Sequence, residues 1–219
     1  MTQPVCTIVG IGPGIGLAVA RRFAREGYVV AMVARKVEPL QRYQADLGAE
    51  GIEAHSFPAD AADADSLTAA FSRIHQQLGT TQVLVYNAAV LVSAKPTELD
   101  AEKLVGEFRV NVVGALVAAQ QVIGPMKAQK KGTILFTGGG LALQPFPPYA
   151  SLAIGKAGIR SLAYTLGGEL EVTGIHVATV TICGSVEPGT KYDPDVIAEE
   201  YWKLHCQPRG KWQREMVFE

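Results

Sequence analysis

This chain of 219 residues has few cysteines, almost no net charge and no long apolar run. Its 20 Lys and Arg nearly balance 21 Asp and Glu, so the formal net charge is −1 and we expect no nucleic acid or membrane surface as a partner. No apolar run is long enough to span a membrane, and the N-terminus lacks a charged-then-apolar export signal. The three cysteines are an odd number, which without an export signal predicts reduced thiols and a cytoplasmic location.

The histidines of the chain also lack the spacing of a metal-binding motif. The chain has only four histidines, which are His55, His75, His176 and His205. Their separations do not match a metal-binding motif, so we expect no metal site and assign these side chains to solvent or to the core. Apolar residues, in contrast, make up 48% of the chain, enough for a large core, and the length predicts a single domain over residues 1–219.

A glycine-dense turn joins an apolar stretch to an amphipathic one within residues 5–26. The residues around Cys6 and Ile8 are apolar and often β-branched, which is typical of a buried parallel strand. From Ile15 onward the apolar residues recur with the period of a helix. Between them lie Gly10, Gly12, Gly14 and Gly16. Glycines let a ligand approach the backbone, and the helix start favours a pyrophosphate, so we predict a nucleotide-binding turn rather than an empty one.

The rest of the chain alternates in the same way between apolar stretches and amphipathic ones. Strands are predicted at Tyr28–Ala34, Ile52–Phe57, Val83–Tyr86, Gly132–Thr137, Ile175–Ile182 and, at the end, Glu215–Phe218. Helices are predicted at Lys36–Leu47, Asp63–Leu78, Ala101–Met126 with a break near Gly114, Pro148–Val172 and Pro194–His205. This alternation predicts an α/β fold of the Rossmann type, with a doubly wound parallel sheet covered by helices on both faces.

These residues resemble the short-chain dehydrogenase/reductase family over nearly the whole chain. Gly10-x-x-x-Gly14-Ile15-Gly16 is similar to the family's nucleotide turn, and Tyr86-Asn87-Ala88-Ala89 is an altered form of its Asn-Asn-Ala-Gly segment. The resemblance implies further roles, which are adenine contact for Asp60, cofactor contact for Asn87, Ala88, Cys183 and Gly184, a structural and catalytic role for Asn111, and ribose binding for Lys156. It also implies an oxidoreductase that acts on a small molecule.

The end of the second predicted strand bears on the choice of cofactor. Enzymes that use NAD usually carry an acidic residue there, which binds the ribose hydroxyls. Here the strand ends at Ala34, followed by Arg35 and Lys36. An arginine fork can bind a 2′-phosphate that a carboxylate would repel, so we expect NADP(H) in preference to NAD(H). The alternative is that Arg35 is one of two solvated surface cations.

The family's usual proton donors are missing. At the family's spacing from Lys156, its catalytic tyrosine corresponds to Leu152 and its serine to Gly139. Neither residue can donate a proton through its side chain, so the chain is predicted to be a divergent member without the usual serine and tyrosine. The Pro-Gly that follows the sixth strand in the family is replaced by Cys183-Gly184.

Tyr149 is the candidate substitute. It lies seven residues before Lys156, and seven helical steps of ~100° return to within ~20° of the same face. The family's enoyl-acyl-carrier-protein reductases have a similar spacing, which implies that Tyr149 stabilises the substrate oxygen. The alternative is that Tyr149 only packs beside Pro147 and Pro148. Two interpretations of Cys183 also remain open, a reactive thiol and an inert one. The sequence shows no basic partner for it, which favours the inert thiol.

Two functions remain open at this point. The first is an NADP(H)-dependent oxidoreductase that transfers a hydride to or from a small carbonyl compound or an activated alkene. The second is a catalytically inactive member that binds the nucleotide as a sensor or partner protein. The helices Ala101–Met126 and Pro148–Val172 carry more apolar and small residues than a sheet-facing side needs, so we also predict a homodimer or homotetramer. The residues behind this prediction are Ala115, Ala118, Ala119, Ala157, Leu162, Ala163 and Leu166.

Overall fold

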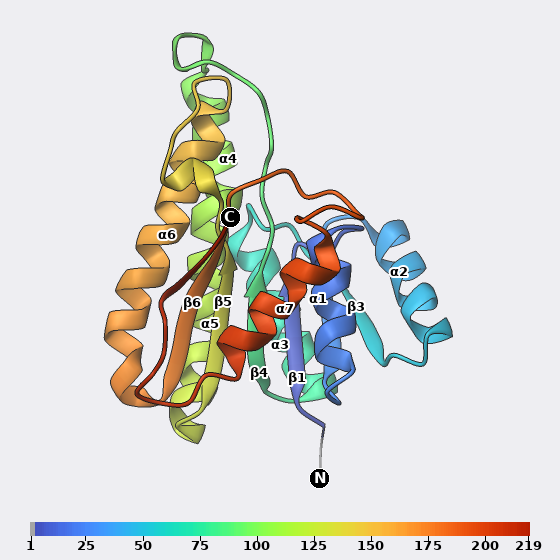
Figure 1. The fold of residues 1–219 in the computed structure, drawn as a ribbon. Coiled ribbons are helices and arrows are strands. Elements are labelled where there is room, and N and C mark those ends of the chain that lie inside the picture. The colour runs from blue at the N-terminus through green and yellow to red at the C-terminus, as the bar shows by residue number, and fades with distance from the viewer. Residues whose placement is uncertain (1–2) are drawn as a thin grey trace.

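One parallel sheet of seven strands organises the molecule. A computed structural model describes residues 3–219 and shows the strand order β3-β2-β1-β4-β5-β6-β7 (Figure 1). The strands are β1 (Val5–Val9), β2 (Val29–Ala34), β3 (Ala54–Pro58), β4 (Thr81–Tyr86), β5 (Gly132–Thr137), β6 (Ile175–Ile182) and β7 (Glu215–Phe218). Every neighbouring pair is parallel, as the alternating sequence pattern predicted.

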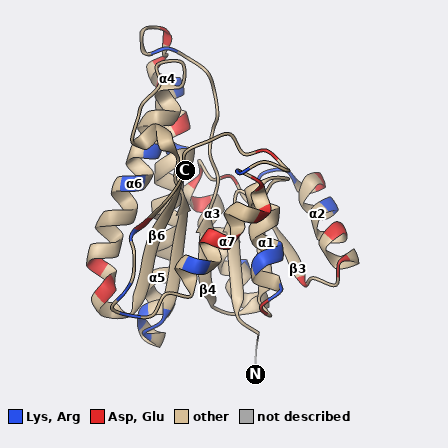
Figure 2. Ribbon diagram, viewed as in Figure 1, with Lys and Arg blue, Asp and Glu red and all other residues tan. Residues whose placement is uncertain are grey.

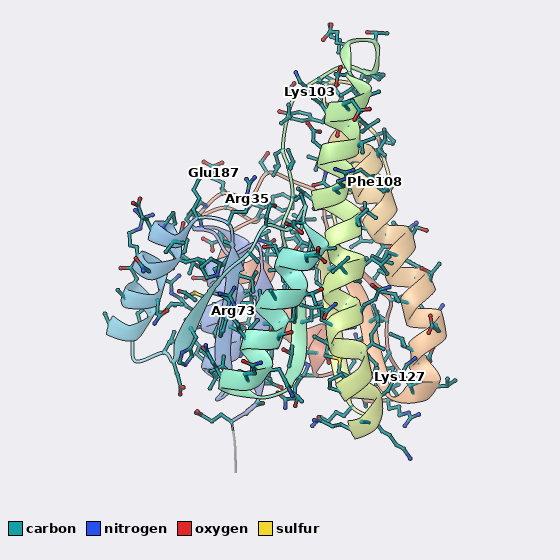
Figure 3. All side chains as sticks on the ribbon, turned by 180° about the vertical axis from the view of Figure 1, so that it is seen from behind. Arg35, Arg73, Lys103, Phe108, Lys127 and Glu187 are labelled. Atoms are coloured by element: carbon teal, nitrogen blue, oxygen red, sulfur yellow. The ribbon has the colours of Figure 1, made fainter. Side chains whose placement is uncertain are left out.

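Helices cover both faces of this sheet. They are α1 (Ile15–Ala24), α2 (Val37–Ala49), α3 (Ala64–Leu78), α4 (Ala101–Phe108), α5 (Gly114–Gln129), α6 (Ala150–Leu170) and α7 (Pro194–His205). One apolar core joins the sheet to α3, α5 and α6, and the other joins it to α1, α2 and α7. Figure 1 shows the side of α1 and α7, and Figure 3 shows the side of α3, α5 and α6. The predicted doubly wound α/β fold is therefore confirmed.

The long helix before β5 differs from its prediction. A break was expected near Gly114, but a π-helical turn over Arg109–Val113 connects α4 to α5 without interruption. Figure 3 labels Phe108 and Lys127 along this continuous column. The break was predicted because glycine disfavours a helix. Gly114 is instead needed for close packing, since a Cβ there would lie 2.3 Å from the Ala61 oxygen.

The helix that carries Lys156 also starts later than predicted. It was expected from Pro148, but Tyr149 is the N-cap residue and Ala150 is the first helical one. Residues 93–94 hold this start in place, because the Ala94 amide donates to the Pro148 oxygen at 2.8 Å and the Ser93 hydroxyl donates to the same oxygen at 3.0 Å. The third strand is shifted in the same manner, to Ala54–Pro58.

Most of the small residues assigned to an oligomer interface lie in the core instead. Five of them are buried inside the chain, namely Ala115, Ala118, Ala119, Ala163 and Leu166. The expectation was wrong for these five because α5 packs against both α3 and the sheet, and α6 packs against α4, the π-helical turn and the sheet, which uses more than one side of each helix. The exposed apolar residues on these helices are Val105, Val113, Ile154 and Ala157.

Charged residues are distributed over the outer faces of the helices and over the loops, with both signs mixed (Figure 2). Across residues 3–219, every helix is too short or too polar to cross a lipid bilayer. Within the same residues, no three His, Cys, Asp or Glu side chains are grouped so that they could hold a metal ion.

Candidate active site

Two adjoining cavities lie at the carboxyl ends of the strands. The larger has a volume of about 940 Å³ and extends from the glycine turn to Lys156, Tyr149 and the loop after β6. The smaller has a volume of about 320 Å³ and lies over the ends of β1 and β2. Asn87, Ala89 and Leu91 line both of them. The strand order reverses between β1 and β4, and open parallel sheets bind their ligands at such a reversal.

The glycine turn fits a dinucleotide. Gly10 has a φ of +89°, and a Cβ there would lie 2.3 Å from the Ala88 nitrogen, so only glycine lets β1 turn this close to β4. Gly12 and Gly14 face open space, with no atom within 4 Å of an added Cβ. The backbone is thus bare where a phosphate would approach it. Gly14 caps α1 without a side-chain hydrogen bond, and the first turn of α1 has no acidic residue, so the helix start is left for an anion.

The smaller cavity brings together the residues that were predicted to contact the adenosine. Arg35 and Asp60 line it with Gly10 and Ala88. The Asp60 carboxylate accepts a hydrogen bond from the Ala62 amide at 2.9 Å, which fixes its orientation. Arg35 is exposed at the end of β2, and within residues 3–219 it forms neither an ion pair nor a hydrogen bond that would hold its guanidinium elsewhere (Figure 3).

Thr137, at the end of β5, connects the two halves of the site, and sequence reasoning missed it. Its hydroxyl donates to the Asn87 side-chain oxygen at 2.8 Å and lies 2.6 Å from the buried Tyr201 hydroxyl. The Asn87 amide in turn donates to the Gly10 oxygen at 2.8 Å. A single chain of hydrogen bonds therefore holds the ends of β1, β4 and β5 together. The signal in the sequence was the hydroxyl side chain at the last position of the predicted strand Gly132–Thr137, directly after three apolar residues.

Lys156 projects from α6 into the floor of the larger cavity. Its Nζ donates to the main-chain oxygen of Thr137 at 2.7 Å. Burial disfavours the ammonium ion and lowers the pKa of Lys156 to about 8. This lysine therefore changes its charge close to neutral pH, which an exposed lysine does not do.

Asn111 lies in the π-helical turn, next to the part of α6 that carries Lys156. Its side-chain oxygen accepts a hydrogen bond from the Val90 amide at 2.7 Å, and its Nδ2 is buried without a partner among the described residues. A small cavity lined by both Asn111 and Lys156 separates the two residues. Gly155 allows this arrangement, because a Cβ there would lie 2.8 Å from the Asn111 side chain.

Gly139 and Leu152 are the residues that the family resemblance predicts at the positions of its serine and tyrosine. Both line the larger cavity beside Lys156. A Cβ on Gly139 would lie 3.4 Å from the methylene groups of Lys156, so the glycine leaves room for a small side chain. Leu152 presents an apolar side chain to the same space. Of these three positions, only Lys156 can form a hydrogen bond with a substrate through its side chain.

Tyr149 and Lys156 line the same cavity, although Tyr149 precedes the helix and the seven-step helical spacing therefore does not place it. Its side chain is 39% exposed, and its ring lies 6.3 Å from the ring of Phe146. Because Tyr149 precedes the first helical residue, it stands at the rim of the cavity and Lys156 stands at the floor. The rim position leaves the tyrosine accessible from the cavity.

Cys183 and Gly184 close the cavity on the side of β6. Burial raises the pKa of the Cys183 thiol, which keeps it protonated and favours the inert alternative. Gly184 packs beneath Tyr192, whose ring atoms would lie 2.2–2.6 Å from a Cβ at that position. The Tyr192 hydroxyl donates to the Cys183 oxygen at 3.2 Å, so the first part of the loop after β6 is held against the sheet.

A nucleotide-binding α/β fold with a buried lysine at the cavity floor defines a class, the dehydrogenases and reductases that use a nicotinamide cofactor. Residues 4–195 match the family model described as short chain dehydrogenase. The chain belongs to the short-chain dehydrogenase family.

Curated relatives and solved structures agree with this assignment. The chain is 32% identical over 209 residues to a 2,3-dihydro-2,3-dihydroxybenzoate dehydrogenase of Bacillus subtilis, covering 95% of this chain and 76% of the relative. It is 31% identical to 2-(S)-hydroxypropyl-CoM dehydrogenase 3 of Xanthobacter autotrophicus, covering 97% and 85%. A short-chain dehydrogenase from Rhodopseudomonas palustris superposes with a TM-score of 0.89 at 27% identity, covering 99% and 98%. The chain is thus an NAD(P)-dependent oxidoreductase.

Proposed function

We propose that this protein is an NADP(H)-dependent oxidoreductase that reduces a small carbonyl compound or an activated alkene, or oxidises the corresponding product. Arg35 is the observation that favours NADP(H), because its guanidinium is exposed in the cavity where the adenosine ribose would lie. A metagenomic short-chain oxidoreductase, 26% identical with a TM-score of 0.89 and covering 99% of this chain and 97% of its own, was solved in complex with NADP.

In this proposal the cofactor residues act together along the two cavities. Asp60 and Ala88 contact the adenine, Arg35 binds the 2′-phosphate, and Lys156 binds the nicotinamide ribose. The turn from Gly10 through Gly12, Gly14, Ile15 and Gly16 holds the pyrophosphate, and Asn87, Cys183 and Gly184 border the nicotinamide. The bound cofactor supplies the hydride.

Proton chemistry falls to Tyr149 and Lys156, since the usual serine and tyrosine are replaced by Gly139 and Leu152. The Tyr149 hydroxyl stabilises the negative charge that develops on the substrate oxygen, and it donates the proton. The Lys156 ammonium adds positive charge at the floor of the same cavity. Asn111 supports Lys156 by packing, since the gap that both residues line is too small for a water molecule. Tyr149 reaches the substrate oxygen across the space that Gly139 leaves open.

We also propose a cellular location and an oligomeric state for this protein. The three cysteines are free thiols in the described structure, which agrees with a cytoplasmic location. Val105, Val113, Ile154 and Ala157 are exposed apolar residues of α4, the π-helical turn and α6, and we propose that they join copies of the chain in a homodimer or homotetramer.

A substrate screen tests the proposal. The absorbance of the reduced nicotinamide is followed while the protein and NADPH are mixed with aldehydes, ketones, enones and enoyl thioesters. Enzyme-dependent loss of absorbance with at least one carbonyl or alkene class is expected. Tight NADPH binding with no loss of absorbance for any class would instead support the inactive, nucleotide-sensing alternative.

A further inference from the structure

The rim of the larger cavity is unusually apolar for an exposed surface. Its lining residues come from the loop after β4, the connection between β5 and α6, and the loop after β6, which all leave the sheet at its carboxyl end (Figure 1). The exposed apolar members are Leu91, Leu143, Phe146, Tyr149 and Val186. Exposed apolar groups that gather around a catalytic cavity mark a place that a ligand covers.

Phe146 is the clearest member of this rim. Its side chain is 53% exposed, although it lies in the wall of a cavity. Among the described residues, Tyr149 is its only aromatic neighbour, with ring centroids 6.3 Å apart and planes inclined by 33°. The two rings form an aromatic wall that presents open surface to the cavity. A ring-containing ligand can bury that surface.

The floor opposite this wall is bare backbone. Gly138, Gly139 and Gly140 follow β5 in succession and line the cavity. A Cβ on Gly139 would meet only the methylene groups of Lys156, at 3.4 Å. Gly138 and Gly140 are packed, since a Cβ would lie 2.6 Å from Thr179 and 3.1 Å from Cys183, so the open space lies at Gly139. Such a space accommodates a ring better than a narrow chain with many rotamers, since the ring loses less conformational entropy on binding.

Charge in the lining disfavours an anionic ligand. Lys156 is the only Lys or Arg among the described residues that line the larger cavity, and its Nζ is already bonded to the Thr137 oxygen. Glu219 lines the same cavity and adds a negative charge. Away from the glycine turn, the donors in the lining are uncharged side chains such as Gln144 and Ser185, and no described Lys or Arg besides Lys156 could pair with a carboxylate there.

We infer that the substrate is a neutral, apolar ketone or enone that contains a ring, and that Phe146 binds the part of it remote from the carbonyl while the Tyr149 hydroxyl is at the substrate oxygen. This inference rests on the proposed oxidoreductase function and names the substrate class for its cavity. Phe146 is a specificity-determining residue that contacts the substrate body and takes no part in the chemistry.

The test uses ketones that share one ring and one reacting carbonyl: cyclohexanone, 4-phenylcyclohexanone and 4-oxocyclohexanecarboxylate. With NADPH, the phenyl compound is expected to have a KM at least about tenfold below that of cyclohexanone, because its second ring buries apolar surface. The carboxylate is expected to be the poorest substrate. Phe146→Ala should raise the KM for the phenyl compound about tenfold, with little change for cyclohexanone. Val172→Ala, which removes an exposed apolar side chain outside the cavity, is the matched control.

Calorimetry of ketone binding to the NADPH-loaded protein tests the substrate class separately from the proposed reaction. If no ketone is reduced but the phenyl compound still binds and Phe146→Ala weakens it, the substrate-class inference survives and the proposed reaction fails. If ketones are reduced but the carboxylate is as good a substrate as the phenyl compound, or Phe146→Ala leaves both KM values unchanged, the inference is overturned and the proposed reaction stands.

Discussion

Individual side chains carry the choice of cofactor and the charge of the site. Arg35 stands at the strand end where an acid would select NAD, and no described partner holds it away from the cavity. Lys156 stands at the floor with a lowered pKa because burial penalises its charge. We propose that the first residue binds the 2′-phosphate of NADPH and that the second sets how the site responds to pH.

Replacement of Arg35 by Ala is expected to weaken NADPH binding by about 1–3 kcal/mol, the range for a charge-assisted hydrogen bond, and to leave NADH binding nearly unchanged. Calorimetry with both cofactors measures the difference. Arg42→Ala is the matched control, because Arg42 is an exposed arginine of α2 that does not line the cavity. Equal weakening for NADPH and NADH would show that Arg35 does not read the phosphate.

Cofactor affinity is expected to depend on pH through Lys156. Its pKa in the protein is about 8, so the ammonium is present below pH 8 and is lost as the pH rises above it. A bound, negatively charged cofactor favours the ammonium, so the affinity for NADPH should be constant just below pH 8 and fall above it. Fluorescence titrations at pH values from about 7 to 9.5 cover this range. In Lys156→Ala the affinity should be lower and its fall above pH 8 should disappear; a fall that persists would assign it to another group.

At the scale of whole elements, the position of Lys156 depends on how closely α6 approaches the π-helical turn before α5. Gly155 lies at this contact, beside Asn111. The turn buries the Asn111 side chain and aims it at the small cavity next to Lys156. The contact between two helices therefore sets the distance between two residues of the site.

Gly155→Ala is expected to lower the free energy of unfolding by about 1–3 kcal/mol, because a methyl group would lie 2.8 Å from Asn111 and force the helices apart. Gly168→Ala in the same helix meets no atom within 4 Å and should instead stabilise the protein by about 0.5–1 kcal/mol. Urea unfolding of both variants provides the comparison. If the two variants shift stability in the same direction, the close contact at Gly155 is not important for stability.

The whole molecule presents exposed apolar residues on α4, the π-helical turn and α6, which we expect to be covered by a second copy. Light scattering at micromolar concentration should give the mass of a dimer or tetramer. Ile154→Asp should shift the mass toward the monomer, because it places a charge in an apolar contact. Val172→Asp, at an exposed residue beyond the end of α6, should leave the mass unchanged. A monomer mass for the unaltered protein would contradict the prediction.

Much of this architecture could be predicted from the sequence, because strand and helix periods and the glycine turn are local signals. The seven strands and the cavity positions of Gly10 and Arg35 follow from them, whereas the role of Lys156 was implied by the family resemblance. The role of Thr137 could not be predicted, since its partners Asn87 and Tyr201 come from distant parts of the chain. Sequence also misjudged Gly114, because a helix break and a close helix contact both require glycine and only packing distinguishes them.

We propose that Tyr149 and Lys156 carry the proton chemistry in place of the serine and tyrosine that the family resemblance predicts to be replaced by Gly139 and Leu152. The most direct measurement is the turnover of NADPH with a verified ketone or enone substrate by the unaltered protein and by Tyr149→Phe. The account predicts a loss of at least about 10²-fold in kcat with NADPH affinity unchanged, as expected when an acid–base group is removed. Adding Gly139→Ser and Leu152→Tyr to that variant should restore carbonyl reduction. Full activity of Tyr149→Phe would contradict the account.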